Sequence, residues 1–188
     1  MLTSDVDYID TWKAMENLVD EGLVKSIGVS NYNITQLERL LSVARIKPLA
    51  IQIELHPYFT RDKLVQYCQD KGITVVAYSP FGAPDREFKN EVKDPCVLLQ
   101  DPVVAAIAKK HGRTSAQVLL RYHIQRGIAV IPKSVTPARI VENAKVFDFQ
   151  LDKEDYDQLA GLNKNWSIRP ASMVAKLQKH KYFPKSDD

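Results

Sequence analysis

The most constraining feature of this sequence is the alternation of short runs rich in β-branched residues with longer segments of helical periodicity. The short runs predict strands at residues 26–29, 49–54, 73–78 and 128–131. Apolar residues at helical spacing predict helices at residues 7–21, 34–44, 61–71, 102–111, 115–126, 137–144 and 153–162. Strands that alternate with helices are typical of βα units around a parallel sheet, so the sequence predicts the α/β class.

Two parallel architectures fit this alternation, an open doubly wound sheet and a (β/α)8 barrel. No GxGxxG follows a predicted strand, which argues against a dinucleotide-binding doubly wound sheet. Polar residues follow all four predicted strands, at the end where barrels hold their active sites. A closed barrel has eight strands, so we expect roughly the second half of a (β/α)8 barrel. It is expected to form one domain over residues 1–188, with an irregular tail from residue 163.

Composition limits the partners of such a domain. The formal net charge is +3 with both signs interspersed, so neither nucleic acid nor an anionic membrane is an expected partner. No apolar run is long enough to cross a bilayer, and the acidic, amphipathic N-terminal segment does not resemble a secretory leader. The two cysteines, Cys68 and Cys96, form no disulfide framework or metal-ligand pattern. A cytoplasmic protein without a metal centre is therefore expected.

An anion site is predicted where the fourth strand leads into its helix, in IAVIPKSVTPARIVEN (residues 128–143). Thr136 suits the N-cap of that helix and Pro137 suits its first position. The free N–H groups of a helix start attract anions, and Lys133 and Arg139 add positive charge. Spacing alone equally allows a capped helix with two solvated cations.

Two other segments are interpreted from the residues alone. Residues 82–100 contain two prolines, mixed charges and no periodicity, which predicts a long loop. His56 precedes a proline after the second strand and has no evident base or metal partner nearby in the sequence, so it is expected to be structural.

Several long motifs make the sequence similar to the aldo-keto reductase family, in its aldose and aldehyde reductase branch. They are DTWKAMENLVDEGLVKSIGVSNYN, QIELHPY, VVAYSPFG, LLRYHIQRGIAVIPKSVTPARIVENAKVFDF and LNKNW. The resemblance extends from Asp10 to Trp166 and implies a (β/α)8 oxidoreductase that reduces aldehydes or ketones with NADPH. The expected substrate is therefore a small carbonyl compound.

The resemblance also implies a set of NADP(H)-binding residues. Ser30, Asn31 and Gln52 match contacts to the nicotinamide amide, and Tyr78 matches the residue that stacks on its ring. The pyrophosphate loop is matched by Ser79, Pro80, Phe81 and Asp85, although many relatives have a serine at Ala83. The 2′-phosphate site is matched by Lys133, Ser134, Thr136 and Arg139, and the adenine contacts by Glu142 and Asn143. Phe88 and Trp166 match positions that face the substrate.

The family reduces carbonyls with a Tyr acid assisted by Lys, Asp and His, and the resemblance places none of these four on this chain. Loss of a proton donor commonly lowers rates by roughly 10² to 10⁴. Reductase activity of the isolated chain is therefore in doubt, and a non-catalytic NADP(H)-binding, structural or regulatory fragment is the alternative. Open strand edges also predict pairing with an N-terminal half or self-association.

Overall fold

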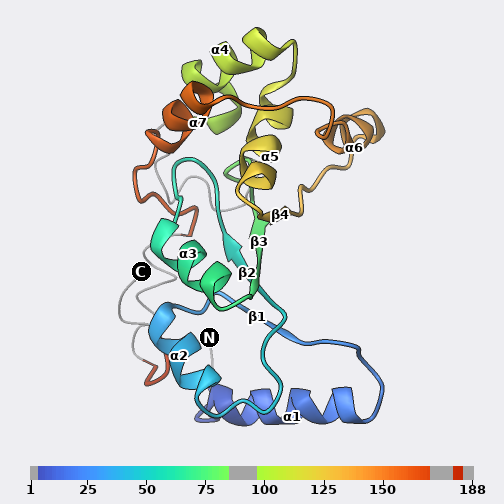
Figure 1. Cartoon of the computed structure of the whole chain (residues 1–188), viewed down its shortest axis with the longest axis vertical. Helices are drawn as coiled ribbons and strands as arrows, with labels where there is room; N and C mark the ends of the chain where they lie inside the picture. Colours follow the sequence, from blue (N-terminus) through green and yellow to red (C-terminus); the bar gives the residue numbers. More distant parts are fainter. Residues whose placement is uncertain (1–3, 85–96, 170–179, 184–188) are drawn as a thin grey trace. The chain divides into compact units, whose positions relative to one another are not determined.

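The computed structural model describes residues 4–84, 97–169 and 180–183 (Figure 1). It confirms the α/β class. Four strands run parallel in the order of the chain: β1 (Gly28–Ser30), β2 (Ala50–Glu54), β3 (Thr74–Tyr78) and β4 (Ala129–Val130). Seven α-helices accompany them in the described residues: α1 (Tyr8–Asp20), α2 (Ile34–Leu41), α3 (Asp62–Asp70), α4 (Pro102–His111), α5 (Ser115–Gln125), α6 (Pro137–Ala144) and α7 (Lys153–Ala160).

Each predicted helix and strand is present, with ends that differ from the predicted ones by at most three residues. The predicted loop at 82–100 is wrong at its end, where Leu98–Gln100 form a 3₁₀ helix, η2, and Leu98 is buried. Apolar burial there overrides the absence of periodicity in the sequence. Residues 85–96 of that loop lie outside the described part of the chain.

The chain divides into two compact units. Unit 1 comprises Met1–Ile53, Asp62–Val75 and Ala171–Asp188, and unit 2 comprises Glu54–Arg61 and Val76–Pro170. Within unit 1, β1 pairs with β2 in the register Gly28↔Ala50 and Ser30↔Gln52. A side chain at Gly28 would place its Cβ 2.7 Å from the Ala50 carbonyl oxygen, so this close approach requires glycine.

The core of unit 1 lies between α1 and the strand that follows it. Ile9 and Trp12 of α1 pack with Ile27 and Leu40. Glu16, one turn after Trp12, is also buried, and its carboxylate accepts hydrogen bonds from the Trp12 indole and from Ile46 N, at 3.1 and 2.8 Å. A buried carboxylate thus joins this helix to the segment before β2.

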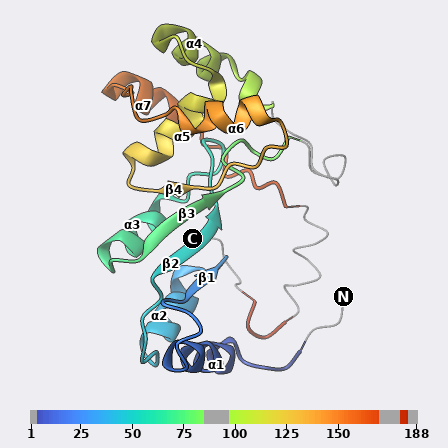
Figure 2. The same ribbon diagram turned by 90° about the vertical axis from the view of Figure 1, so that its right-hand side faces the viewer.

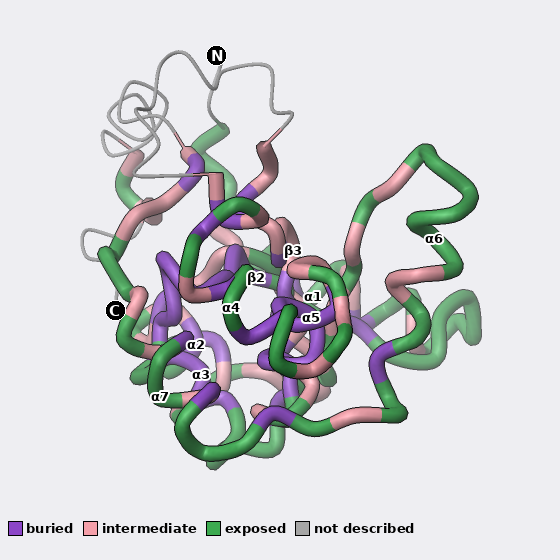
Figure 3. Tube along the Cα trace, turned by 90° about the horizontal axis from the view of Figure 1, so that it is seen from above, coloured by how far each residue is buried: buried purple, intermediate pink, exposed green. Residues whose placement is uncertain are grey.

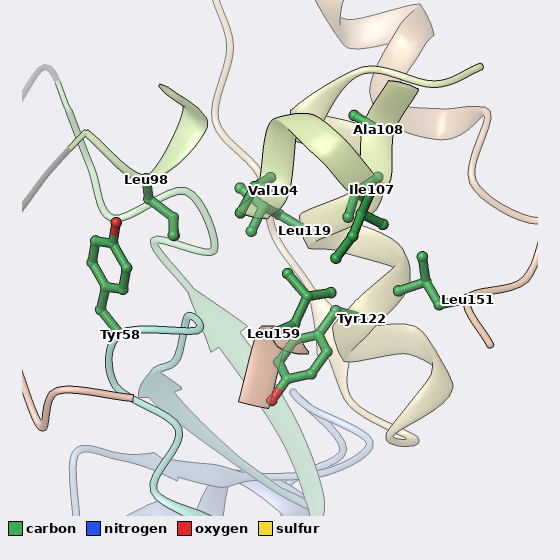
Figure 4. Close-up of a cluster of buried hydrophobic side chains, with 10 residues drawn as sticks. Tyr58, Leu98, Val104, Ile107, Ala108, Leu119, Tyr122, Leu151 and Leu159 are labelled. Carbon is green, nitrogen blue, oxygen red and sulfur yellow. The ribbon is translucent and has the colours of Figure 1, made fainter. Parts of the chain in front are cut away.

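The core of unit 2 lies among α4, α5 and α7, which lie side by side in both ribbon views (Figures 1 and 2). The buried side chains, shown in Figure 4, converge from all three helices, from η2 and from the segment after β2. They are Tyr58, Leu98, Val104, Ile107, Ala108, Val118, Leu119, Tyr122, Leu151 and Leu159. Burial of this much apolar surface is the main force that holds the three helices together.

Helix α6 differs from the other helices of unit 2. None of its residues is buried, and Figure 3 shows its ribbon as exposed or intermediate throughout. Ile140 and Val141 on the helix are more than half exposed, and so are Val135 before it and Phe147 after it. We call these four residues the α6 apolar face. Strand β4, which precedes the helix, is the last strand in the sheet order.

Candidate functional site

The chain turns sharply as it leaves β3. Ser79 has a φ of 51° and Gly82 a φ of 72°, both in the left-handed region. Gly82 N donates to the Ser79 carbonyl at 2.8 Å, which closes a turn over Pro80 and Phe81. A serine in this conformation is uncommon, and such conformations often occur at functional sites. We call residues 79–82 the β3 turn.

The segment between β4 and α6 carries the predicted cations. Pro137 occupies the first position of α6, as predicted, and Thr136 occupies the N-cap position. The predicted N-cap residue is therefore confirmed, but its side chain makes no capping hydrogen bond. Instead the hydroxyl of Ser134 accepts from Thr136 N at 3.2 Å. Ser134 thus forms a local turn just before α6.

A second helix start lies at the same place and was not predicted as part of the site. Thr114 caps α5 by accepting from Gln117 N, and the Gln117 side chain accepts from Thr114 N. The Thr114 hydroxyl donates to Glu142 Oε1 of α6 at 2.9 Å. The signal in the sequence is the TSAQ motif of a capping box before an apolar run. Because this pattern is common, it points to a helix start rather than to a site.

These segments surround a cavity of about 570 Å³ within unit 2. This volume falls in the range of small-molecule sites. Eight predicted cofactor residues line it: Ser79, Pro80, Phe81, Lys133, Ser134, Arg139, Glu142 and Asn143. It is completed by residues that sequence reasoning did not select: Ala83, Pro84, Leu99, Thr114, Ser115, Ala116 and Ile131. Two predicted residues of the same segments, Tyr78 and Thr136, are not in its lining.

The electrostatics of the cavity favour an anion. Lys133 and Arg139 are exposed, and among the described residues neither has an acidic group within ion-pair distance. The one carboxylate in the lining, Glu142, accepts from the Thr114 hydroxyl. The starts of α5 and α6 both contribute to the wall, and each brings the positive end of a helix dipole. The cavity thus combines two cations with two helix N-termini.

The predicted nicotinamide contacts belong to unit 1 at the ends of β1 and β2. Ser30 Oγ donates to the Gln52 carbonyl at 2.9 Å, and Asn31 Nδ2 donates to Ser30 Oγ at 3.1 Å. Asn31 has a φ of 58° and its N–H also donates to the Gln52 carbonyl. The three residues therefore lie together, with Ser30 and Gln52 exposed.

The remaining predicted positions have different outcomes. Asp85 and Phe88 lie outside the described residues. Trp166 is partly buried, and its ring lies 5.7 Å from that of His56 and 6.3 Å from that of Tyr58. The expectation that His56 has no nearby partner is wrong, because its Nε2 lies 3.1 Å from Glu54 Oε1. The sequence did not reveal this pair, because the alternation of apolar and polar residues predicts a strand but not the contacts of side chains that follow it.

The Aldo/keto reductase family profile matches residues 2–164. Aldo-keto reductase family 1 member A1 of Gallus gallus is 51% identical over 160 residues, which is 85% of this chain and 48% of that protein. The human protein of the same name is 50% identical over 159 residues, with the same coverage. Member A1-A of Danio rerio is 46% identical over 186 residues, 96% of this chain and 57% of that protein.

The chain belongs to the aldo-keto reductase family. The resemblance seen in its motifs is therefore confirmed, and the family is one of oxidoreductases that use NAD(P)H. The chain spans about half the length of the curated relatives it matches. In this aldo-keto reductase chain, no helix among residues 4–84, 97–169 and 180–183 has the length and apolar character of a membrane span.

Proposed function

We propose that this chain is the cofactor-binding half of an NADP(H)-dependent carbonyl reductase, and that the unit 2 cavity holds the adenosine end of the dinucleotide. The observation that carries the proposal is the placement of Lys133 and Arg139, without acidic partners in the described residues, on a cavity that two helix starts share. Ser134 and Asn143 add polar groups to the wall. A phosphate monoester matches this set, because cations and backbone N–H groups both stabilise its charge.

The preference for NADP(H) over NAD(H) follows from the two cations. The dinucleotides differ by the 2′-phosphate, and only that group would pair with both side chains. Glu142 is a carboxylate near the proposed phosphate site. Its Oε1 accepts a hydrogen bond from the Thr114 hydroxyl, which reduces its repulsion of a bound anion. When bound, the dinucleotide would supply the hydride, and the residues of this chain would bind and orient it.

Fluorescence titration with NADPH and NADH tests this proposal. The unmodified chain is expected to bind NADPH more tightly, and Lys133→Ala with Arg139→Ala is expected to abolish the difference. Lys109→Ala with Lys153→Ala is the matched control, since it removes two exposed lysines from α4 and α7, outside the cavity lining. A preference for NADPH that survives in the first double variant removes Lys133 and Arg139 from the proposed site.

The proton donor of the proposed reaction would come from outside this chain. We propose that the α6 apolar face and the edge of β4 receive a βα segment of the same family, equivalent to the half of the relatives that the chain does not span. A parallel strand edge and exposed Ile140 and Val141 offer hydrogen bonds and apolar surface to such a segment. The apolar side chains of this surface support a βα partner more than a charged one.

Co-expression with the unmatched N-terminal half of the Gallus gallus relative tests this proposal. A stable complex that reduces a simple aldehyde with NADPH is expected, whereas the chain alone is expected to show turnover near background. Ile140→Asp should prevent assembly, and Lys109→Asp on α4 is the control. A chain that is monomeric and reduces aldehydes by itself would contradict the proposal. NADPH binding without turnover in the complex would favour the alternative, a non-catalytic dinucleotide-binding protein.

A further inference from the structure

A single buried carboxylate joins two segments of unit 2 that are far apart in the sequence. Glu54 is fully buried at the end of β2. Its Oε1 accepts from Ile168 N at 2.7 Å, and its Oε2 accepts from the Ser167 hydroxyl at 2.9 Å. Arg169 Nε lies 3.6 Å from Oε2 as an ion pair. Residues 167–169 therefore all contact one carboxylate, and we call this arrangement the Glu54 latch.

The latch also involves the histidine that follows β2. His56 Nε2 lies 3.1 Å from Glu54 Oε1, and both side chains have no exposed surface. An ionised carboxylate only accepts hydrogen bonds, so Nε2 must carry the proton. Both carboxylate oxygens are then occupied by donors. Such a saturated group fixes the position of its donors, because any shift would leave a buried charge less well paired.

The protonation state of Glu54 agrees with this geometry. Burial alone would raise its pKa, but the hydrogen bonds from His56, Ile168 and Ser167 hold the pKa below its ordinary value. The carboxylate is therefore ionised at neutral pH. His123, also fully buried, has a pKa lowered to about 3 by burial and by the nearby charge of Arg126, so it is neutral. Arg169 and His56 are the groups that face the charge.

Contacts continue from the latch to the cavity wall through Trp166. Trp166 N donates to the Tyr58 carbonyl at 3.0 Å, one residue before the latched segment begins. The edge of its indole lies near the β3 turn, since a Cβ built on Gly82 would be 4.0 Å from Trp166 Cζ3. Phe81 of that turn and Ala83, which directly follows it, line the cavity. Trp166 thus packs between the latched segment and the cavity wall.

We propose that Glu54 is a positioning residue whose carboxylate fixes residues 167–169, and through them holds Trp166 against the β3 turn that forms one wall of the cavity. Loss of the carboxylate then frees the indole and loosens the wall. The expected effect on dinucleotide affinity rests on the proposed function, but the effect on Trp166 does not. Nothing in the sequence motifs marks Glu54 for this role, because its donors follow it by more than a hundred residues.

The test uses the indole itself. The chain has two tryptophans, so Trp12→Phe leaves Trp166 as the single reporter. In that background, Glu54→Gln should red-shift Trp166 emission and raise its quenching by acrylamide, without any ligand. Glu16→Gln in the same background is the matched control, because Glu16 is also buried and still accepts from Ile46 N in unit 1. The control variant should lose stability while Trp166 quenching stays the same.

NADPH titration of the same variants tests the connection to the cavity. Glu54→Gln is expected to weaken binding by about ten-fold, the equivalent of one lost charge-assisted hydrogen bond. Glu16→Gln should leave the affinity unchanged. If Glu54→Gln increases the quenching of Trp166 but leaves NADPH affinity unchanged, the proposed link between Trp166 and the cavity wall is overturned. If the parent chain binds no NADPH, the proposed function fails, and the quenching result still decides the role of Glu54.

Variants on the other side of the latch cover the case in which Glu54→Gln does not fold. Ser167→Ala and Arg169→Gln each remove one partner of the carboxylate and leave β2 unchanged. Each should raise Trp166 quenching by less than Glu54→Gln does, and the pair together should raise it more than either alone. Unchanged quenching in the double variant overturns the proposal.

Discussion

The cavity of unit 2 and the Glu54 latch lie in the same unit but treat charge in opposite ways. At the cavity, Lys133 and Arg139 are exposed and have no acidic partner among the described residues. At the latch, Glu54 is fully buried and accepts hydrogen bonds from His56, Ser167 and Ile168. The difference indicates that the cavity is suited to bind an anionic ligand. The latch carboxylate, in contrast, is already paired by groups of the protein.

The largest effect should follow removal of the latch carboxylate. Glu54→Ala leaves the buried Ile168 N–H and the buried His56 Nε2 without their acceptor, together with the half-buried Ser167 hydroxyl. Each buried donor left unsatisfied costs about 1–3 kcal/mol of unfolding free energy. Urea denaturation measures it, with Glu142→Ala as a comparison from the cavity. Similar losses for the two variants would erase the contrast between the regions.

The second effect is the dependence of stability on pH that the buried His123 causes. Its pKa is lowered from 6.5 to about 3 in the folded chain, so the unfolded chain binds its proton first as pH falls. The stabilising contribution of neutral His123 is therefore complete above pH 6.5 and decreases as pH falls from 6.5 toward 3. His123→Leu should flatten the dependence of the urea midpoint on pH in this window. An unchanged slope would show that other groups control acid stability.

A smaller effect on stability should distinguish the N-cap threonines of α5 and α6, Thr114 and Thr136. Thr114 makes a capping box, so Thr114→Ala should cost about 1 kcal/mol of stability. Thr136 makes no capping bond, and Thr136→Ala should change stability very little. Thermal unfolding of both variants provides the comparison. Equal losses would mean that Thr136 contributes through a contact other than a cap.

The smallest effect on stability is expected from the cavity cations. Both are exposed, and substitutions at such positions usually change the unfolding free energy by less than about 0.5 kcal/mol. Lys133→Ala with Arg139→Ala should therefore melt at nearly the same temperature as the parent, although its NADPH preference should be lost. A clear drop in melting temperature would indicate that the cations have structural partners in the folded chain.

Local patterns in the sequence were sufficient for the helices, the strands and the two cations of the cavity. Pro137 at the first position of α6, for example, depends only on its own ring geometry. Lys133 and Arg139 were found because they are close in sequence to that helix start. The family motifs then added residues of the β3 turn, such as Ser79, which no local pattern would have selected.

The rest depends on contacts between distant segments. Thr114 lines the cavity and donates to Glu142, which follows it by 28 residues, and no periodicity in the sequence predicts that contact. The partners of Glu54 follow it by 113 and 114 residues. Thr136 occupies the expected N-cap position, but its side chain makes no capping bond, and its own N–H donates to Ser134 Oγ. In each case the residue type and its local position follow from the sequence, but its hydrogen-bond partner does not.

The left-handed backbone at Ser79 restricts which substitutions a mutagenesis library could accept there. With a φ of 51°, glycine and asparagine should be tolerated, while valine or isoleucine would clash with its own main chain. Asn31, with a φ of 58° after β1, faces the same restriction. A saturation screen at these two positions should therefore enrich small or amide side chains even when selection is for folding alone and no dinucleotide is supplied.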